Sequence, residues 1–205
     1  MEFLSEGPVA RPELTLPPEE AAFLRERYAE ATEILEYGSG GSTVVASELD
    51  GKTITSVESD RDWADMMQRW FKENPGKSPV DVFHADIGPT KDWGYPTGPE
   101  EWRRFPSYPL RVWERAKDIA PDLVLVDGRF RVGCALATAF RTAKPVTLLF
   151  DDYAERKAYH RVTEFLGQPR MVGRGGQGAV TAQLAEAAGV AHDAGTFGFR
   201  TLTSP

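Results

Sequence analysis

The sequence predicts a doubly wound α/β fold, in which a mostly parallel, Rossmann-like sheet carries helices on both faces. Two observations predict it. Between residues 34 and 166, five short runs of β-branched and aliphatic residues alternate with segments of helical periodicity. A glycine-rich turn follows the first run, and acidic residues follow the other four. Right-handed crossovers would join these runs into one parallel sheet, and we expect about seven strands with an antiparallel strand at the edge.

The spacing of apolar residues assigns each element in turn. Apolar residues at i, i+3 and i+4 mark helices, and short β-branched runs bounded by turn residues mark strands. The expected elements are a helix at 19–31 within an N-terminal extension over 1–31, strands at 34–37, 53–58, 80–86, 122–127 and 146–152, and helices at 42–51, 60–76, 110–118, 131–140 and 153–166. After residue 166, residues 181–189 have a helix-like pattern and 197–203 a strand-like one, and we expect antiparallel edge strands in this region.

Residues 87–109 interrupt the alternation. Prolines and glycines are mixed there with the aromatic side chains of Trp93, Tyr95, Trp102, Phe105 and Tyr108. We expect no regular structure in this segment beyond a turn of helix near residues 100–104. A segment of this length inside a compact domain is more typical of a lid or substrate loop than of a simple connection. A packed surface loop is the alternative.

Length and composition fit a single domain over residues 1–205. The chain is long enough for one full core, with 41% hydrophobic and 27% charged residues. A net charge of −7 gives no long-range attraction to nucleic acid. With one cysteine, no signal-peptide pattern and no apolar run of the roughly 18 residues that span a membrane, we expect a cytoplasmic protein. We expect a small-molecule partner and neither nucleic acid nor membrane, and we leave a homodimer open.

Acidic or glycine-rich residues follow every predicted parallel strand. Ligands of open parallel sheets bind at the carboxyl ends of the strands, and an unpaired carboxylate is costly to bury there. The chain places at these ends the turn at 38–41 and the carboxylates of Glu58, Asp86, Asp127, Asp151 and Asp152. The pattern therefore predicts a binding cleft along this edge of the sheet.

The glycine turn indicates which ligand enters the cleft. A dinucleotide fingerprint requires a third small residue where this chain has Thr43, and Glu36 just before the turn would repel a pyrophosphate. The Glu36 carboxylate could instead accept, directly or through water, from a cationic amino group. Glu58 follows Gly38 by about 20 residues, the usual spacing for an acid that binds ribose hydroxyls, and this feature fits NAD as well.

Four motifs together resemble those of a known enzyme family. EYGSGGST, SVESD, FHAD and LVLVDG, in this order within residues 34–152, are similar to motifs one to four of the class I S-adenosylmethionine-dependent methyltransferases. The resemblance implies binding of S-adenosylmethionine and transfer of its methyl group. The contacts it implies are Gly38, Ser39 and Gly40 with the methionine moiety, Glu58 with the ribose, Asp86 and Ile87 with the adenine, and Asp127 beside the transferable methyl. The charge argument above adds Glu36 to this cofactor-binding set.

The ends of the fourth and fifth strands are similar to those of catechol and caffeoyl-coenzyme-A O-methyltransferases. Acids at these positions hold a divalent cation in those families, so the similarity implies Asp127, Asp151 and Asp152 as ligands of Mg²⁺ or another divalent ion. The fifth strand ends Asp-Asp here, whereas it usually ends Asp-Asn in those families. Helix caps and ion pairs are the alternative role of these acids. Arg129 and Arg131 could pair with Asp127 or bind an anionic acceptor.

The sequence therefore predicts methyl transfer to an unidentified, small-molecule acceptor. Positioning dominates such chemistry, and Asp127 and Asp152 are the candidate catalytic groups that would help an oxygen or nitrogen nucleophile lose its proton. The segment DGRFRVGC is similar to a subset of small methyltransferase-like proteins. Two alternatives stay open: a non-catalytic binding protein that keeps the fold, and a nicotinamide-dependent oxidoreductase.

Overall fold

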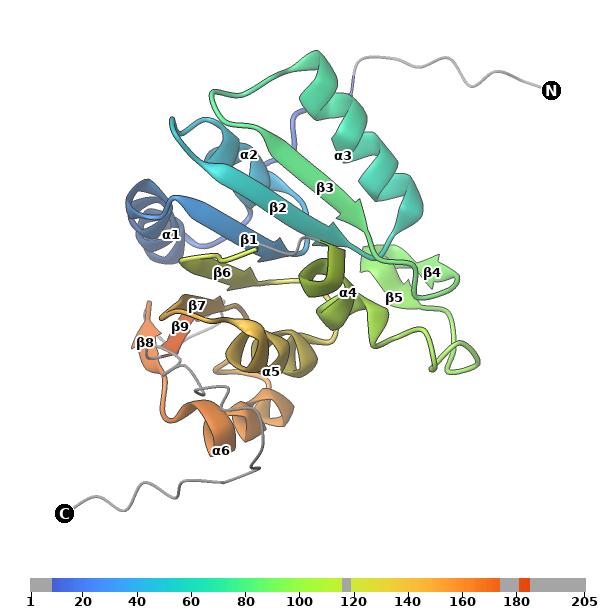
Figure 1. Cartoon of the computed structure of the whole chain (residues 1–205), viewed down its shortest axis with the longest axis vertical. Coiled ribbons are helices and arrows are strands. Elements are labelled where there is room, and N and C mark those ends of the chain that lie inside the picture. The colour runs from blue at the N-terminus through green and yellow to red at the C-terminus, as the bar shows by residue number, and fades with distance from the viewer. Residues whose placement is uncertain (1–8, 116–118, 174–180, 185–205) are drawn as a thin grey trace.

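A seven-stranded sheet forms the centre of the computed structural model, which describes residues 9–115, 119–173 and 181–184 (Figure 1). The strands are β1 (Glu33–Tyr37), β2 (Thr53–Glu58), β3 (Val80–His84), β6 (Leu123–Val126), β7 (Thr147–Phe150), β8 (Arg170–Val172) and β9 (Thr181–Leu184). Their order is β3-β2-β1-β6-β7-β9-β8, and the first five run parallel. β9 is antiparallel to both β7 and β8. The predicted fold class is confirmed, with the antiparallel strand one position inside the edge that β8 forms.

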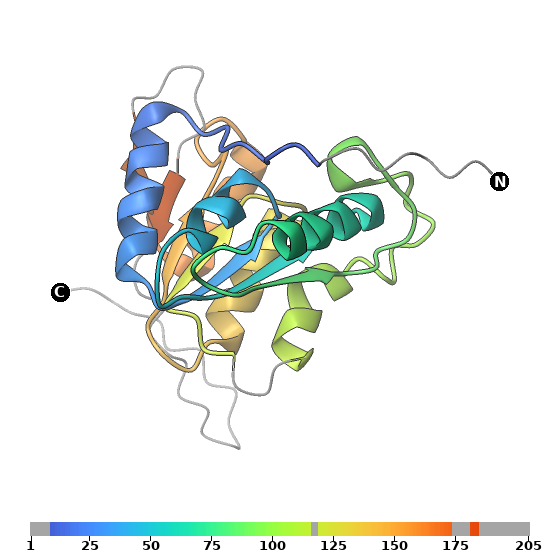
Figure 2. The ribbon, with the colours of Figure 1, turned by 90° about the horizontal axis from the view of Figure 1, so that it is seen from above.

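Helices cover both faces of the sheet (Figure 2). They are α1 (Pro18–Glu30), α2 (Gly41–Ser47), α3 (Arg61–Glu73), α4 (Ser107–Arg115), α5 (Arg131–Arg141) and α6 (Thr163–Leu166). Successive strand residues point to opposite faces, so Ile34 of β1 packs in the cluster that contains α1 and α2, and Leu35 packs with α4 and α5. None of the helices in the described part of the chain has the length and hydrophobicity of a membrane-spanning segment.

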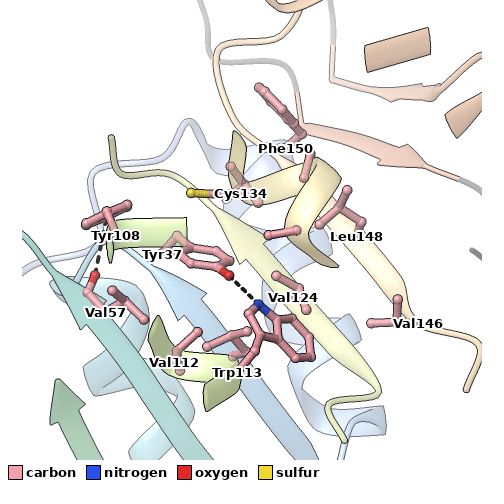
Figure 3. Close-up of a cluster of buried hydrophobic side chains, with 14 of the residues drawn as sticks. Tyr37, Val57, Tyr108, Val112, Trp113, Val124, Cys134, Val146, Leu148 and Phe150 are labelled. Atoms are coloured by element: carbon pink, nitrogen blue, oxygen red, sulfur yellow. Dashed lines mark hydrogen bonds between the residues drawn. The ribbon is translucent and has the colours of Figure 1, made fainter. Parts of the chain in front are cut away.

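The larger core cluster lies between the sheet and the layer of α4 and α5 (Figure 3). Trp113 of α4 donates its indole N–H to the hydroxyl of Tyr37 (2.8 Å), which donates in turn to the carbonyl of Pro109 (2.8 Å). The hydroxyl of Tyr108 donates to the carbonyl of Val57 (3.2 Å). The buried aromatic side chains thus have partners for their polar ends. These bonds fix α4 beneath the carboxyl ends of β1 and β2.

The end of the described chain differs from the predicted elements. The helix expected at 153–166 is a 3₁₀ helix at Lys157–Val162 followed by the short α6. The helix-like pattern at 181–189 was misleading, because residues Thr181–Leu184 form β9. Pairing with β7 on one side and β8 on the other outweighs the helix propensity of this alanine-containing segment. The strand expected at 197–203 lies outside the described residues.

The segment at 87–109 contains a small hairpin, which the sequence analysis did not anticipate. β4 (Thr90–Lys91) and β5 (Tyr95–Pro96) pair antiparallel around a 3₁₀ turn at Asp92–Gly94. Trp93 and Gly94 both have positive φ, at 64° and 67°. Tight hairpin connections require this backbone conformation, which a bulky residue such as tryptophan seldom adopts. The sequence therefore carried no ordinary signal for this turn.

Candidate active site

The turn after β1 lies directly against the turn after β6. Gly38 has φ of 106°, and a Cβ at this position would lie 3.0 Å from the backbone nitrogen of Gly128 and 3.2 Å from the carbonyl carbon of Asp127. A side chain would therefore meet both a strained backbone and a steric conflict. The glycine permits the close approach that brings the predicted methionine-binding turn next to Asp127.

Glu36 lies beneath this turn, fully buried on the face of β1 that α1 and α2 cover. The Tyr28 hydroxyl donates to its Oε1 (2.5 Å) and the Thr43 hydroxyl to its Oε2 (2.5 Å), and Thr43 Oγ1 accepts from the N–H of Gly40 (3.0 Å). Burial raises the pKa of Glu36 despite these donors. Both carboxylate oxygens therefore bond to the protein, and Glu36 supports the turn from below.

Tyr28 and Thr43 were not among the predicted site residues. Thr43 served only as an argument against a dinucleotide, and Tyr28 lies in the expected helix at 19–31. The signal in the sequence was the alternation along β1, which places Glu36 on the same face as Ile34, toward α1 and α2. A buried carboxylate at that position needs donors from the facing helices.

Glu58, at the end of β2, is the second buried carboxylate of this region, with 8% of its surface exposed. Its Oε1 accepts from the backbone N–H groups of Ser59 (2.6 Å) and Asp60 (2.9 Å), and its Oε2 accepts from the N–H of Ser39 (3.3 Å). Burial raises the pKa of Glu58, and these amide donors act in the opposite direction. The bond to Ser39 joins the predicted ribose-binding acid to the glycine turn.

The hairpin of residues 90–96 packs on Glu58. A Cβ at Gly94 would lie 2.4 Å from Ser59 Oγ and 3.2 Å from Glu58 Oε1, and the Ser59 hydroxyl donates to the Gly94 carbonyl (3.0 Å). Asp60 also accepts from the hydroxyl of Thr90 (2.9 Å). Part of the segment predicted as a lid thus contacts the predicted cofactor-binding acid.

Asp86 and Ile87 follow β3, next to the end of β2. The N–H of Ala85 donates to the Glu58 carbonyl (2.7 Å), which places the two strand ends side by side. Asp86 accepts from the N–H of Gly88 (3.0 Å) and forms an ion pair with Arg104. The Ile87 side chain is fully buried in the larger core cluster. Ile87 therefore anchors this segment through its side chain and leaves the half-buried Asp86 nearer the surface.

A guanidinium stands among the three acids that end β6 and β7. Arg131, at the start of α5, forms ion pairs with Asp127 (3.0 Å), Asp151 (3.2 Å) and Asp152 (3.3 Å), and its side chain is only 5% exposed. It also donates to the carbonyl oxygens of Gly128 (3.0 Å), Asp127 (2.9 Å) and Asp151 (2.6 Å). Six acceptors thus surround this side chain. The ion-pair alternative of the sequence analysis is present.

Asp127 is the most accessible of the three acids, with 37% of its side chain exposed compared with 23% for Asp152 and 8% for Asp151. Desolvation and the neighbouring carboxylate of Asp151 raise the pKa of Asp127 well above its ordinary value, although the charge of Arg131 acts in the opposite direction. The raised pKa makes Asp127 a stronger base than an exposed aspartate.

This arrangement corrects the expected metal site. Asp127, Asp151 and Asp152 do not fit a resident divalent cation, because the Arg131 guanidinium lies between them and uses oxygens that a metal would need. Over residues 9–115, 119–173 and 181–184, no group of three or more His, Cys, Asp or Glu side chains could hold a metal ion. The sequence placed the three acids together and offered Arg131 as a partner of Asp127, but it did not indicate that Arg131 is shared by all three acids.

Comparisons with known proteins place this geometry among methyltransferase structures. No protein-family model matches the sequence, and no curated protein does. A crystal structure of a methyltransferase-like protein from Silicibacter pomeroyi is 58% identical, with a TM-score of 0.78 over 85% of this chain and 89% of that chain.

Two more distant structures share the fold. An O-methyltransferase from Bacillus cereus, in complex with S-adenosylhomocysteine, is 14% identical, with a TM-score of 0.60 over 87% of this chain and 84% of that one. The O-methyltransferase TomG from Streptomyces achromogenes, in complex with S-adenosylmethionine, is 15% identical, with a TM-score of 0.52 over 84% and 82% of the two chains.

Proposed function

Because the chain belongs to the class I S-adenosylmethionine-dependent methyltransferase-like family, we propose that it transfers the methyl group of S-adenosylmethionine to a small-molecule acceptor. The observation that carries the proposal is the convergence of three strand ends. The glycine turn after β1 contacts the backbone at Asp127 after β6, and Ser39 of the same turn donates to Glu58 at the end of β2. This edge of an α/β sheet is where such folds bind their ligands.

The cofactor-binding roles follow from position. In this proposal the backbone at 38–40 faces the methionine moiety and Glu58 accepts from the ribose hydroxyls. Asp86 borders the adenine, together with the backbone of Ile87, whose side chain is buried in the core. Glu36 acts on the cofactor through the turn, since its side chain is fully buried and bonded to Tyr28 and Thr43. The buried acids of this half receive uncharged donors, which suits a ligand that brings its own positive charge.

Residues on the β6 side would handle the acceptor. When bound, S-adenosylmethionine supplies an electrophilic methyl group on a sulfonium. Asp127, half-buried with a raised pKa, can take the proton that an oxygen or nitrogen nucleophile loses. Asp152 is paired with both Arg131 and Arg156, so its contribution is to fix these cations. Arg131 supplies the positive charge that the acid cluster needs without a metal ion.

The proposal extends to the organisation of the chain. The whole chain acts as a single domain, in which the N-terminal extension reaches the site through Tyr28 of α1. Residues 87–109 serve as the lid or substrate loop. The contacts of Gly94 with Ser59 and Glu58 support this role, because they connect the hairpin to the ribose-binding position.

Calorimetry with S-adenosylmethionine, S-adenosylhomocysteine and NAD tests the proposal. We expect the two adenosyl ligands to bind and NAD not to. We expect Glu58→Ala to weaken S-adenosylhomocysteine binding by about 1.5 to 3 kcal/mol, because the ribose hydroxyls lose a charged acceptor. Glu73→Ala, an exposed acid at the end of α3, is the matched control. Binding of NAD alone would favour an oxidoreductase, and unchanged affinity in folded Glu58→Ala and Glu58→Gln variants would contradict the assigned pocket.

A negative result in methyl transfer has a separate meaning. Binding of S-adenosylmethionine with no methyl transfer across a broad panel of acceptors would favour a binding protein that retains the fold. Transfer from radiolabelled S-adenosylmethionine to any small molecule of the panel would support the enzyme.

A further inference from the structure

The guanidinium groups of Arg129 and its neighbour Arg131 have different partners. It lies in the loop after β6, and its guanidinium carbon is 3.9 Å from the centre of the Tyr95 ring. Arg131 binds three carboxylates, whereas Arg129 forms no ion pair with any carboxylate of the described residues. A half-buried guanidinium over an aromatic ring is held in place, and a guanidinium has five N–H donors, so a contact with Tyr95 leaves donors for an anion.

A second guanidinium joins this pair from the loop after β7. Arg156 is half exposed and forms an ion pair with Asp152 (2.8 Å). Hydrogen bonding to Arg156, together with the charge of Arg129, lowers the pKa of the Tyr95 hydroxyl. Arg129, Tyr95 and Arg156 therefore form one cluster, called here the Arg–Tyr cluster, built from three separate segments of the chain.

The cluster stands next to the proposed chemistry. Arg129 is two residues after Asp127, and Arg156 shares Asp152 with Arg131. Tyr95 belongs to the hairpin whose Gly94 contacts Glu58. The cluster thus lies at the carboxyl ends of β6 and β7, on the acceptor side of the site, and the hairpin supplies its third member. Because Arg156 is paired with Asp152, Arg129 is the cation of this cluster that no carboxylate of the described residues offsets, and it gives the site a local preference for anions in a protein of net charge −7.

We propose that the Arg–Tyr cluster is the acceptor subsite and that it recognises a carboxylate on the small molecule that is methylated. Arginine binds a planar carboxylate through paired N–H donors, and the Tyr95 hydroxyl, partly exposed, offers one more polar contact. The identification of the bound molecule as the methyl acceptor rests on the proposed function, whereas the anion-binding site itself rests on the Arg–Tyr cluster alone.

The test uses the full chain saturated with S-adenosylhomocysteine and a panel of acid and amide pairs: benzoate, 4-hydroxybenzoate and cinnamate, each with its uncharged amide. Binding is measured by saturation-transfer NMR and calorimetry. We expect at least one acid to bind about tenfold or more tightly than its amide, as the loss of a charged hydrogen bond implies. We expect Arg129→Gln to abolish that preference and Tyr95→Phe to reduce it. Arg141→Gln, at the far end of α5, should leave it unchanged.

The outcomes separate the two proposals. If S-adenosylhomocysteine binds and no acid is preferred over its amide, or the preference survives in Arg129→Gln, the Arg–Tyr cluster is not the acceptor subsite and the proposed function stands. If the acids bind through Arg129 and S-adenosylhomocysteine does not bind, the anion site stands and the proposed function falls. Arg129→Gln should keep the cofactor affinity of the unmodified protein, and a parallel loss of both affinities would indicate a structural role for Arg129 and overturn the subsite.

Discussion

The carboxylates at the two halves of the sheet edge receive different partners. At the ends of β1 and β2, Glu36 and Glu58 accept from hydroxyl and backbone N–H groups, and no arginine or lysine of the described residues pairs with them. At the ends of β6 and β7, the three aspartates surround Arg131. The first half leaves a positive charge to be supplied by a ligand, whereas the second contains its own cation.

Because of this difference, one edge of the sheet can bind a cationic ligand in its first half and an anionic ligand in its second. Burial raises the pKa of Glu36 and Glu58, and their neutral donors act in the opposite direction without bringing a positive charge, so an incoming cation is favoured. A buried guanidinium instead meets its acids through charge-assisted hydrogen bonds, and the set becomes a rigid structural unit. The remaining arginines, Arg129 and Arg156, then give the second half a different preference from the first.

Removing the internal cation should have the largest effect. Arg131→Met keeps much of the side-chain volume and leaves three carboxylates without their shared partner, and breaking a buried ion pair in this way costs about 3 to 5 kcal/mol. Urea denaturation followed by circular dichroism measures the free energy of unfolding. Arg141→Met, at the exposed end of the same helix, should change it by less than about 0.5 kcal/mol. Equal values for the two variants would contradict a structural role for the Arg131 cluster.

Neutralising the buried acid of the first half should give an effect that depends on pH. Burial raises the folded-state pKa of Glu36, so its folded form keeps a proton that the unfolded chain releases near pH 4.3. The stability linked to this proton is complete below that pH and is lost as the pH rises through the folded-state pKa.

Glu36→Gln cannot lose that proton, so its stability relative to the unmodified protein should increase with pH. Each unit by which the pKa is raised corresponds to about 1.4 kcal/mol. Urea denaturation across a pH series from acid to neutral measures the difference. A difference that does not change with pH would mean that Glu36 is charged in the folded protein at little cost.

Adding or removing a divalent cation should have the smallest effect. A cation that bound the folded protein at 100 times its dissociation constant would stabilise it by about 2.7 kcal/mol. Because Arg131 occupies the centre of the acid cluster, we expect Mg²⁺ and the chelator EDTA to leave the melting temperature unchanged. In Arg131→Met the three acids have lost the guanidinium between them, so we expect Mg²⁺ to raise the melting temperature of this variant. A clear Mg²⁺ response in the unmodified protein would show that the acids bind a metal despite the guanidinium.

The parts of the fold that follow a repeating pattern could be predicted from the sequence. The five parallel strands were legible because each is short, β-branched or aliphatic and bounded by turns. β9 was not, because its residues favour a helix and only its neighbours β7 and β8 make it a strand. The hairpin at 90–96 was missed for a related reason, since its turn places Trp93 in a conformation that tryptophan rarely adopts.

Local sequence patterns are enough to place a glycine turn and a series of acids at the carboxyl ends of parallel strands, where the topology of the sheet makes them neighbours. The partners of each acid follow only from the folded structure. Tyr28 and Thr43 reach Glu36 from α1 and α2, which cover that face of β1, and the Arg131 side chain bonds to residues that follow both β6 and β7. Such partners depend on side-chain direction and packing between elements, which local patterns do not encode.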